Sequence, residues 1–400
     1  MAIGIIAEYN PFHAGHAHQI SEIKKIRDGE IVAVMSGSFM QRGSPAILDK
    51  WTRAQLAVMG GCDLVLELPF VFAVRSAQDF ARGGIRLLKS LGVVDTLAFG
   101  AEIADVEKLK LAATAFKEKF FAEKLHQLMS QGISYAVAVT KILAEVTQLD
   151  EKLLRRPNTI LAIEYLRALP EKISPLIIER IGAAYDDLTL REKFSSASAI
   201  RAALYENPPP WKKISAQVDD ATLDALREEK ISGLVDESFL FRPILAKLLT
   251  AHIDELKKIY GITEGLEYRL LNATTAKNFS ELIKILIGRR YTASRVRRLL
   301  LYFLLDMTAA EIIELDAATC IRVLAFNERG QALLKKIPAP VVTKVTKHLN
   351  RRDLYERQRP LESYQKILLF DVLATNLRGI LFETPRPQQT DFSTPPKVNV

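Results

Sequence analysis

Three of the six histidines of this 400-residue chain, His13, His16 and His18, lie in one short segment near the N-terminus. The segment follows an apolar run, residues 3–7, and Gly15 stands between the first two histidines. A glycine at the start of a helix lets backbone N–H groups approach a phosphate closely. Imidazoles beside it can donate hydrogen bonds to the charge that builds up when a phosphorus atom is attacked. We therefore interpret residues 8–16 as a nucleotide-binding turn.

Two other interpretations of these histidines stay open. They can be zinc ligands, but neither Cys62 nor Cys320 is near them in sequence, and a His-x-x-His-x-His run alone does not complete a coordination sphere. They can also be ordinary polar loop residues, because many short motif matches are accidental. We favour the nucleotide site and predict no dedicated metal site.

The elements expected around this segment alternate between short apolar runs and amphipathic stretches. Predicted strands cover residues 2–7, 31–35, 63–68, 96–99 and 176–181, and predicted helices cover residues 15–26, 49–59 and 76–91, with Asp49 as an N-cap. The alternation predicts an α/β fold, a Rossmann-like domain with a parallel sheet wrapped by helices. The ligand of such a sheet lies at the carboxyl ends of its strands.

Polar residues accumulate at these predicted strand ends. They are Asn10, His13 and His16 after the first strand, residues 36–42 after the second, Gly100 after the fourth and Arg180 in the fifth. The segment that follows the fifth strand contains Ser196 and Ser198, either of which can cap a helix. Together with Arg201, such a cap can bind phosphate.

Strand patterns fade beyond residue 201, and Pro208–Pro210 indicates a linker. We predict a first domain over residues 1–205, containing the nucleotide site. A mostly α-helical, basic C-terminal domain follows over residues 206–382. Residues 383–400 are rich in Pro, Thr and Gln, which predicts a disordered tail.

Two basic clusters lie in the helical half. The first contains Lys284, Arg289, Arg290, Arg295, Arg297 and Arg298, and the second contains Lys344, Lys347, His348, Arg351 and Arg352. A charge run is usually a solvated face. Two such clusters, with Tyr291 and Tyr302 available for stacking, favour RNA binding by this half.

The net charge of the whole chain is +8, which favours binding of an acidic partner. Nucleic acid is the first candidate and a membrane surface the second. No window reaches eighteen uninterrupted apolar residues, so we expect no membrane-spanning helix. The N-terminus lacks the pattern of a signal peptide, and two distant cysteines form no disulfide framework. We expect a cytoplasmic protein.

The segment from Glu8 to His16, Glu-Tyr-Asn-Pro-Phe-His-Ala-Gly-His, resembles the N-terminal signature of the bacterial tRNA(Met) cytidine acetate ligases. These are a branch of the nucleotidylyltransferases, whose mark is (Thr/His)-x-Gly-His. Further segments resemble the family in the same order: residues 34–43, 63–69, 99–102, 156–161 and 289–295. The short histidine motif alone supports only the superfamily, and the longer set supports the narrower assignment.

The resemblance implies a ligase that joins acetate to ATP, releases pyrophosphate and passes the acetyl group to N4 of the wobble cytidine of elongator tRNA(Met). It implies His13 and His16 as catalytic residues and an ATP site completed by Gly100, Asn158 and Arg180. The loop part of that ATP site is Ile6, Ala7, Glu8, Tyr9, Asn10, Pro11, Phe12, His13, Ala14, Gly15, His16, Ala17, His18 and Gln19. Phosphate or RNA contacts are expected from Ser196, Arg201, Arg289, Arg290, Arg295, Arg297 and Arg298.

Attack on a phosphate also suggests Mg²⁺, for which Glu8 and Asp49 are candidates although no carboxylate cluster is present. Gln41, Arg42, Lys50 and Arg53 lie near predicted strand ends and are expected to face the approaching tRNA. Two other functions stay open. One is a small-molecule adenylyltransferase or ligase of the same superfamily, and the other is a non-catalytic RNA-binding protein.

Overall fold

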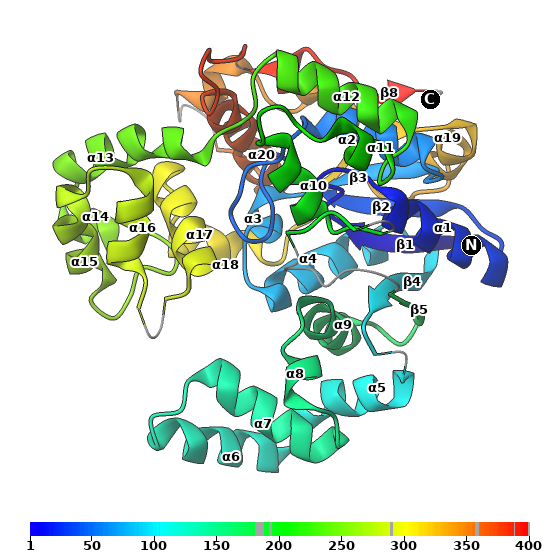
Figure 1. The fold of residues 1–400 in the computed structure, drawn as a ribbon, viewed down its shortest axis with the longest axis horizontal. Coiled ribbons are helices and arrows are strands. Elements are labelled where there is room, and N and C mark those ends of the chain that lie inside the picture. The colour runs from blue at the N-terminus through cyan, green and yellow to red at the C-terminus, as the bar shows by residue number, and fades with distance from the viewer. Residues whose placement is uncertain are drawn as a thin grey trace.

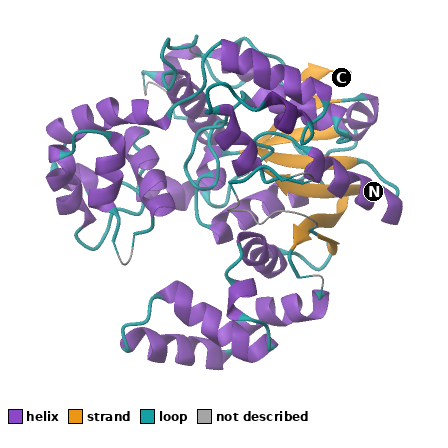
Figure 2. Ribbon diagram, in the orientation of Figure 1, coloured by secondary structure: helices purple, strands orange, loops and turns teal. Residues whose placement is uncertain are grey.

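The computed structural model of the chain describes residues 1–103, 105–180, 188–191, 194–288, 291–356, 360–387 and 389–398. Within these residues an eight-stranded sheet has the order β5-β4-β1-β2-β3-β6-β7, and β8 pairs with β6 (Figures 1 and 2). The strands are β1 (Ala2–Ala7), β2 (Ile31–Ser36), β3 (Leu64–Leu68), β4 (Val94–Ala101), β5 (Ser174–Glu179), β6 (Ile321–Phe326), β7 (Val341–Val342) and β8 (Lys397–Val398). From β5 to β3 all pairs are parallel, which confirms the predicted α/β class.

The connections of the parallel strands reverse direction between β1 and β4. The chain runs from β1 to β2 and β3 on one side, and it then crosses back to β4 and β5 on the other side of β1. Neighbouring connections therefore diverge above the carboxyl ends of β1 and β4. In open α/β sheets this divergence leaves the crevice in which ligands bind.

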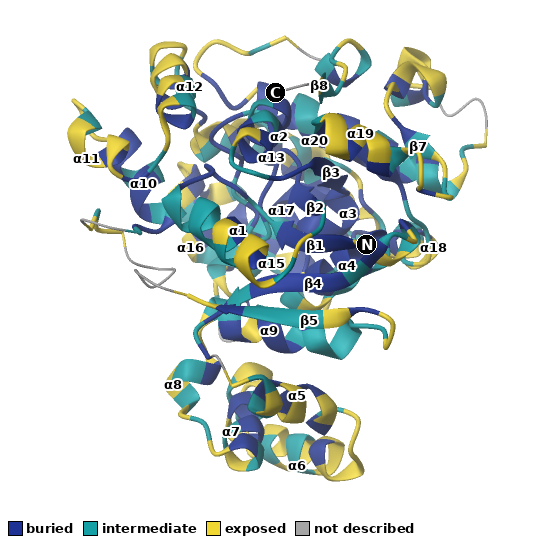
Figure 3. Ribbon diagram, turned by 90° about the vertical axis from the view of Figure 1, so that its right-hand side faces the viewer, coloured by how far each residue is buried: buried dark blue, intermediate teal, exposed yellow. Residues whose placement is uncertain are grey.

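Helices of the sheet body cover the strands. They are α1 (Ala14–Ile26), α2 (Lys50–Met59), α3 (Phe70–Ala73), α4 (Ala77–Ser90), α9 (Pro157–Ala168), α10 (Ala197–Leu204), α11 (Trp211–Ser215), α12 (Asp220–Ile231), α19 (Glu328–Leu334) and α20 (Ser363–Gly379). The carboxylate of Asp49 accepts hydrogen bonds from the N–H groups of Trp51 and Thr52, which confirms the predicted N-cap of α2. Every residue of β2 and β3 is buried, whereas the edge strand β5 is partly exposed (Figure 3).

Two groups of helices extend from this body. One lies between β4 and α9, at the bottom of Figure 1, and contains α5 (Val106–Ala115), α6 (Lys119–Ser130), α7 (Tyr135–Thr147) and α8 (Glu151–Leu154). The other lies at the left of Figure 1 and is called the helical lobe below. It contains η1 (Glu237–Leu240), α13 (Phe241–Thr250), α14 (Ile253–Leu256), α15 (Leu266–Asn272), η2 (Ala273–Thr275), α16 (Phe279–Leu286), α17 (Ala293–Leu304) and α18 (Ala309–Leu315). No helix in the described residues combines the length and the apolar character needed to cross a membrane.

The C-terminal part contains two features that the sequence did not predict. Strand β6 joins the sheet antiparallel to β3, so residues beyond 205 are not all helical. The segment expected to be a disordered tail contains η5 (Thr390–Phe392) and β8, and it follows the short turns η3 (Val345–Lys347) and η4 (Arg351–Leu354) and helix α20. The amino-acid composition of this segment suggested disorder. Composition does not show the contacts that the segment makes with distant residues of the sheet body. The domain boundaries themselves stay a prediction.

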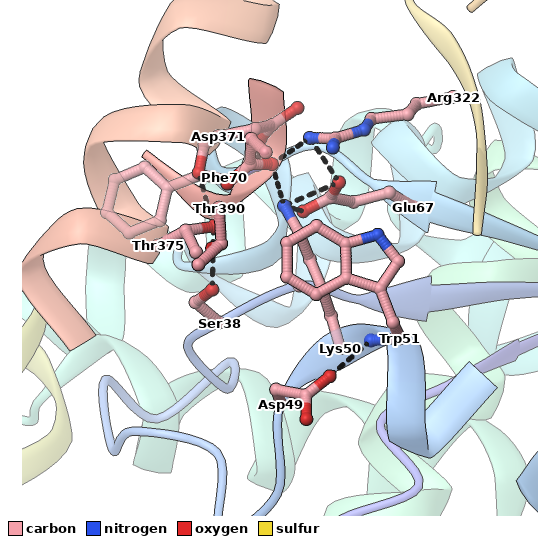
Figure 4. A network of polar contacts seen from close by, with 12 residues as sticks. Ser38, Asp49, Lys50, Trp51, Glu67, Phe70, Arg322, Asp371, Thr375 and Thr390 are labelled. Atoms are coloured by element: carbon pink, nitrogen blue, oxygen red, sulfur yellow. Dashed lines mark hydrogen bonds and ion pairs between the residues drawn. The ribbon is translucent and has the colours of Figure 1, made fainter. Parts of the chain in front are cut away.

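One such partner is a buried network of charges (Figure 4). The Nζ atom of Lys50 lies 2.8 Å from Oε1 of Glu67 and 2.7 Å from Oδ1 of Asp391, and Arg322 forms ion pairs with both carboxylates. The Lys50 and Asp391 side chains are fully buried. Isolated charges would be costly there, and their mutual pairing offsets that cost. The network thereby fixes the C-terminal segment to α2, β3 and β6.

A third acid, Asp371 of α20, lies beside these pairs. Its Oδ1 atom accepts a hydrogen bond of 2.6 Å from the N–H of Phe70. Burial and the neighbouring Glu67 raise the pKa of Asp371 well above its usual value. For Asp391, burial acts in the same direction, but Arg322 and Lys50 outweigh it and lower the pKa. Lys50 and Arg322 thus pair with the carboxylates of Glu67 and Asp391, whereas burial and Glu67 favour the neutral form of Asp371.

Candidate active site

A cavity of about 370 Å³ lies at the carboxyl ends of β1 and β4, where the connections of the sheet diverge. It is called the first cavity below. Segments far apart in sequence line it, among them the β1–α1 turn, the loop after β2, the start of α4, the end of β4, the start of α9 and the start of α10. The predicted site residues that line it are Ile6, Ala7, Glu8, Tyr9, Asn10, His13, His16, Gln19, Gly100, Asn158, Arg180, Ser196 and Arg201. The structure therefore brings the principal candidates together.

The two histidines of the turn are held by local hydrogen bonds. His13 is the N-cap of α1, and its Nδ1 atom accepts a hydrogen bond of 3.0 Å from the N–H of Gly15. The Nδ1 atom of His16 accepts one of 3.3 Å from the N–H of His13. Because Nδ1 is an acceptor in both rings, the proton of each neutral imidazole is on Nε2. Each ring can then donate one hydrogen bond to a ligand.

Their surroundings keep both rings uncharged. Burial lowers the pKa of His13 to about 3, and the cationic Arg180 and Arg201 act in the same direction. Burial, His13 and Arg180 lower the pKa of His16 well below its usual value. The positive charge that the site offers to an anionic ligand thus comes from the guanidinium groups, and the imidazoles act as neutral donors.

The polar residues at the start of the turn hold the adjoining loops. The side-chain oxygen of Asn10 accepts a hydrogen bond of 2.8 Å from the N–H of Ile47, and the carboxylate of Glu8 accepts one of 2.7 Å from the N–H of Gln41. Asn10 thus positions a loop and does not reach the ligand through this oxygen. Its amide nitrogen is buried and has no hydrogen-bond partner among the described residues.

The wall opposite the turn is built by β4, β5 and α9. The amide of Asn158 donates a hydrogen bond of 2.8 Å to Glu102, which joins the start of α9 to the end of β4. At Gly100 a Cβ atom would lie 3.0 Å from Cγ of Arg180. Glycine therefore makes room for the Arg180 side chain beside the ligand space.

The start of α10 contributes a capped helix end and a fixed guanidinium group. The hydroxyl of Ser196 accepts a hydrogen bond of 3.0 Å from the N–H of Ala199, which confirms its predicted role as an N-cap. Arg201 donates to the carbonyl oxygen of Asn10, at 2.6 Å, and to the hydroxyl of Ser198, at 3.1 Å. A helix N-terminus and an arginine at this position suit an anionic ligand.

Some residues of the predicted ATP loop do not line the first cavity. These are Pro11, Phe12, Ala14, Gly15, Ala17 and His18. Phe12 is buried and packs against Tyr9 and His16, so its role is to support the turn. His18 lies next to Glu22, 3.9 Å away, and contacts the ring of Phe194. Ala14, Gly15, Ala17 and His18 lie in α1 and do not line the cavity because only one face of a helix meets it.

Other side chains of the first cavity had not been predicted for the nucleotide. Its apolar wall includes Phe80, Phe99, Leu161 and Tyr165, and its rim includes Arg155 and Arg42. Apolar residues that line a site form no recognisable sequence motif, so only the folded structure shows that they line it. Arg155, in contrast, directly precedes the segment 156–161 that was singled out, and its position was a usable indication.

Two residues expected to face an approaching tRNA are instead buried. Lys50 belongs to the charge network, and Arg53 donates hydrogen bonds to the carbonyl oxygens of Glu8, at 2.7 Å, and of Gly37. Both expectations were wrong, because they placed these side chains from sequence proximity to strand ends alone. Gln41 and Arg42 do line the first cavity.

The predicted basic contacts of the helical half have different surroundings. Arg297 forms a two-pronged ion pair with Glu237, with distances of 2.9 and 2.7 Å, and Arg298 donates to the carbonyl oxygen of Gln41 at 3.4 Å. The guanidinium of Arg295 lies 4.5 Å from the ring centre of Tyr291. Arg289 and Arg290 lie outside the described residues. RNA contacts by this set stay a prediction.

The structure also bears on the two candidate magnesium ligands and on zinc. The carboxylate of Asp49 is occupied by Trp51 and Thr52 at the N-terminus of α2, whereas Glu8 lines the first cavity. Glu8 alone thus fits a magnesium ion held mainly by phosphate oxygens. Across the described parts of the chain, no group of three or more His, Cys, Asp or Glu side chains is placed to hold a metal ion.

Comparisons with known proteins agree with this geometry. The model of the HIGH Nucleotidyl Transferase family matches residues 1–392. A protein of Thermoanaerobacter sp. (strain X514), named tRNA(Met) cytidine acetate ligase, is 37% identical over 408 residues, with 98% of each chain covered. One of the same name from Caldanaerobacter subterraneus subsp. tengcongensis is 38% identical over 413 residues, again with 98% of each chain covered.

Solved structures share the fold as well. The crystal structure of Thermotoga maritima TmcAL in its apo form I has a TM-score of 0.89 at 30% sequence identity. The structure of TmcAL bound with alpha-thio ATP has a TM-score of 0.86 at 29% identity. Each comparison covers 99% of both chains.

Proposed function

Since the chain belongs to the HIGH nucleotidyl transferase family and to the tRNA(Met) cytidine acetate ligases within it, we propose that it is an ATP-dependent ligase that acetylates a cytidine of tRNA. It activates acetate as acetyl-adenylate and passes the acetyl group to N4 of the wobble cytidine of elongator tRNA(Met). We also propose a cytoplasmic location, where a reaction on tRNA would take place.

The observation that carries this proposal is the pair of neutral histidines in the first cavity. Both rings have Nδ1 engaged with backbone N–H groups and therefore donate through Nε2. Arg180 and Arg201 line the same cavity. Fixed donors and guanidinium groups at one place suit a polyphosphate whose negative charge shifts during reaction.

In the first half-reaction a carboxylate oxygen of acetate attacks the α-phosphorus of ATP. The bond from that phosphorus to the bridging oxygen breaks, and pyrophosphate leaves with the electron pair. His13 and His16 donate hydrogen bonds to the phosphate oxygens as charge moves onto them. Arg180 and Arg201 reduce the repulsion between the anionic nucleophile and the triphosphate. Positioning and electrostatics are sufficient, and no covalent enzyme intermediate is needed.

The adenosine part of ATP has a separate wall. Phe80, Phe99, Leu161 and Tyr165 provide an apolar surface for a purine, and the side chain of Asn158 offers polar atoms to base or ribose. Glu8 is the residue that would hold Mg²⁺ together with phosphate oxygens, and that ion would supply further neutralisation of the triphosphate.

In the second half-reaction N4 of the cytidine attacks the carbonyl carbon of acetyl-adenylate. The bond between that carbon and the AMP oxygen breaks, AMP leaves, and the new amide nitrogen loses one proton. The base must leave the anticodon stack to reach this carbon. The basic residues of the C-terminal half, including Arg295, are proposed to hold the tRNA backbone.

The test is an assay with labelled acetate, ATP and either elongator tRNA(Met) or no RNA. Labelled tRNA that requires ATP supports the proposal. Acetyl-adenylate that forms but never labels tRNA would instead indicate a small-molecule ligase, and absence of ATP consumption would indicate a non-catalytic RNA-binding protein.

A further inference from the structure

A second cavity, of about 620 Å³, lies next to the first. Arg42 and Arg201 line both cavities, so the two spaces meet at these side chains. The loop that follows β2, the end of α10, the start of η1 and the first turn of α17 form its walls. Figure 1 shows α17 on the side of the helical lobe that faces the sheet body. The cavity thus lies where the two parts of the chain meet.

The walls of this second cavity are firmly connected. At Gly43 in the loop after β2, a Cβ atom would lie 2.9 Å from Cβ of Arg297, so loop and helix are in close contact. Arg297 is paired with Glu237 across the cavity wall. The loop, η1 and α17 therefore contact one another directly, and these contacts define the shape of the second cavity.

The chemistry of the walls suits a single nucleotide unit. Tyr205 is 51% exposed and lines the cavity, and its hydroxyl donates to the carbonyl oxygen of Val235, which fixes the ring. Ile47 and Val235 add apolar surface beside it. Unstacked RNA bases are commonly received on aromatic rings in this way.

The other end of the cavity suits a phosphodiester. Thr292, the N-cap of the twelve-residue helix α17, and the first helical residues Ala293 and Ser294 line it together with Arg42 and Arg297. Asp236 and Glu237 line it too, and Glu237 balances the charge of Arg297, so Arg42 and the helix N-terminus are the main attraction for a phosphate at this end. A helix N-terminus beside guanidinium groups attracts phosphate. An aromatic platform and a phosphate-binding end in one cavity match a nucleotide that has left its stack.

We propose that the second cavity receives the acceptor cytidine of the tRNA, with the base on Tyr205 and its flanking phosphate near the start of α17. This inference rests on the proposed function. The shared side chains Arg42 and Arg201 then form the border across which N4 reaches the acetyl group in the first cavity. Tyr205 is a positioning residue for the second half-reaction and takes no part in the first.

The main experiment compares Tyr205→Ala and Tyr205→Phe in both half-reactions. For Tyr205→Ala we expect acetate-dependent ATP–pyrophosphate exchange within twofold of wild type, and a kcat/KM for acetyl transfer to tRNA lower by roughly ten- to a hundredfold, the range for loss of one stacked base. Tyr205→Phe keeps the ring and should transfer at nearly the wild-type rate. Equal transfer by Tyr205→Ala and wild type would overturn the proposal.

A cavity-filling pair provides a second variant. Ala293 and Ala309 are each the first residue of a helix capped by threonine, and Ala293 lines the second cavity whereas Ala309 is exposed elsewhere on the helical lobe. Ala293→Phe should block transfer and spare exchange, and Ala309→Phe should spare both. A raised KM for ATP in Ala293→Phe would assign the cavity to ATP and overturn the proposal.

A binding measurement gives a readout independent of turnover. The probe is an anticodon stem–loop RNA that carries a fluorescent cytidine analogue at the wobble position. Wild type and Tyr205→Phe should quench the analogue by stacking, and Tyr205→Ala should bind the RNA without quenching. Quenching that survives in Tyr205→Ala contradicts the assignment. If wild type labels no tRNA at all, the proposed function fails, and the inference that rests on it fails for that separate reason.

Discussion

The Nδ1 atom of His16 accepts a hydrogen bond from the N–H of His13, and the two rings stack with centres 3.8 Å apart. Each histidine thereby fixes the orientation of the other, with Gly15 bound to the first ring. A Cβ atom at Gly15 would lie 2.9 Å from Cε1 of His13, so a larger residue would disturb this arrangement. The spacing His-x-Gly-His thus places two stacked imidazoles at the start of α1, each with its Nδ1 atom bound to a backbone N–H.

Replacing His16 with alanine removes one of these donors. We expect acetyl-adenylate formation to fall by about 100- to 1,000-fold, because the loss of one fixed donor to a developing charge has that magnitude. The Kd for tRNA should stay within a few-fold of wild type, since the histidine acts on phosphate of ATP. ATP–pyrophosphate exchange and filter binding measure the two quantities. His18→Ala is the matched control, outside the first cavity, and it should leave exchange within twofold.

The low pKa of His13 makes protein stability depend on pH in a defined direction. His13 has a pKa of about 3 in the folded chain and 6.5 when unfolded, so the unfolded state takes up the proton first as pH falls. The free energy of unfolding should therefore decrease below pH 6.5. Between pH 7.5 and 5.5 this residue accounts for about 1.4 kcal/mol.

His13→Asn tests this dependence, because asparagine can replace the N-cap of α1 but does not titrate. Denaturant unfolding measures the free energy of unfolding at both pH values. Between pH 7.5 and 5.5 this free energy should fall by about 1.4 kcal/mol less in His13→Asn than in wild type. An identical decrease in both proteins would show that His13 is not held neutral.

The two buried acids Asp391 and Asp371 should respond differently to the same substitution. Asp391→Asn leaves Lys50 and Arg322 short of a carboxylate, and breaking a buried pair in this way costs about 3–5 kcal/mol. Among the described residues, Asp371 forms no ion pair with Lys50 or Arg322 like those of Asp391, its pKa is raised by burial, and Asp371→Asn keeps an acceptor for the N–H of Phe70, so we expect a loss below about 1 kcal/mol.

Unfolding by denaturant measures both variants, with Asp254→Asn as the control. Asp254 is exposed and lies 3.9 Å from Lys257, so its replacement should change stability by less than about 0.5 kcal/mol. Equal losses for Asp391→Asn and Asp371→Asn would contradict the different roles of these two acids in the network.

Two arginines of α17 should separate RNA binding from folding. Arg295→Gln should flatten the slope of log Kd for tRNA against log salt by about 0.7–0.9, the value of one phosphate contact. Arg298→Gln should lower the melting temperature and change that slope less than Arg295→Gln does, because Arg298 contacts Gln41 and Tyr302 within the protein. A slope that is unaffected by Arg295→Gln would remove this helix from the RNA interface.

Local patterns in the sequence were sufficient for the β1–α1 turn and for the helix caps. A run of apolar residues, a glycine between two histidines and the N-caps Asp49 and Ser196 all act within a few residues of one another. Short stretches of sequence therefore determine the geometry of these features. The same holds for the parallel strands, which are apolar because both of their faces are covered.

The surroundings of charged side chains could not be derived in this way. The sequence suggested that Lys50 and Arg53 face the tRNA, and it suggested that residues 383–400 are disordered. In the structure Lys50 pairs with Asp391 from that very segment, and β8 adds to the sheet. Arg297 likewise finds its carboxylate partner in η1.

The sequence by itself determined the nucleotide-binding turn, the α/β class and the membership of the family, since all three depend on residues close together or on motifs in a fixed order. Tertiary structure alone decided which charges are buried, which arginines are already paired, and that a second cavity adjoins the first. The reason is physical: burial and ion pairing depend on distances in space between residues such as Lys50 and Asp391, and those distances are set only when the whole chain has folded.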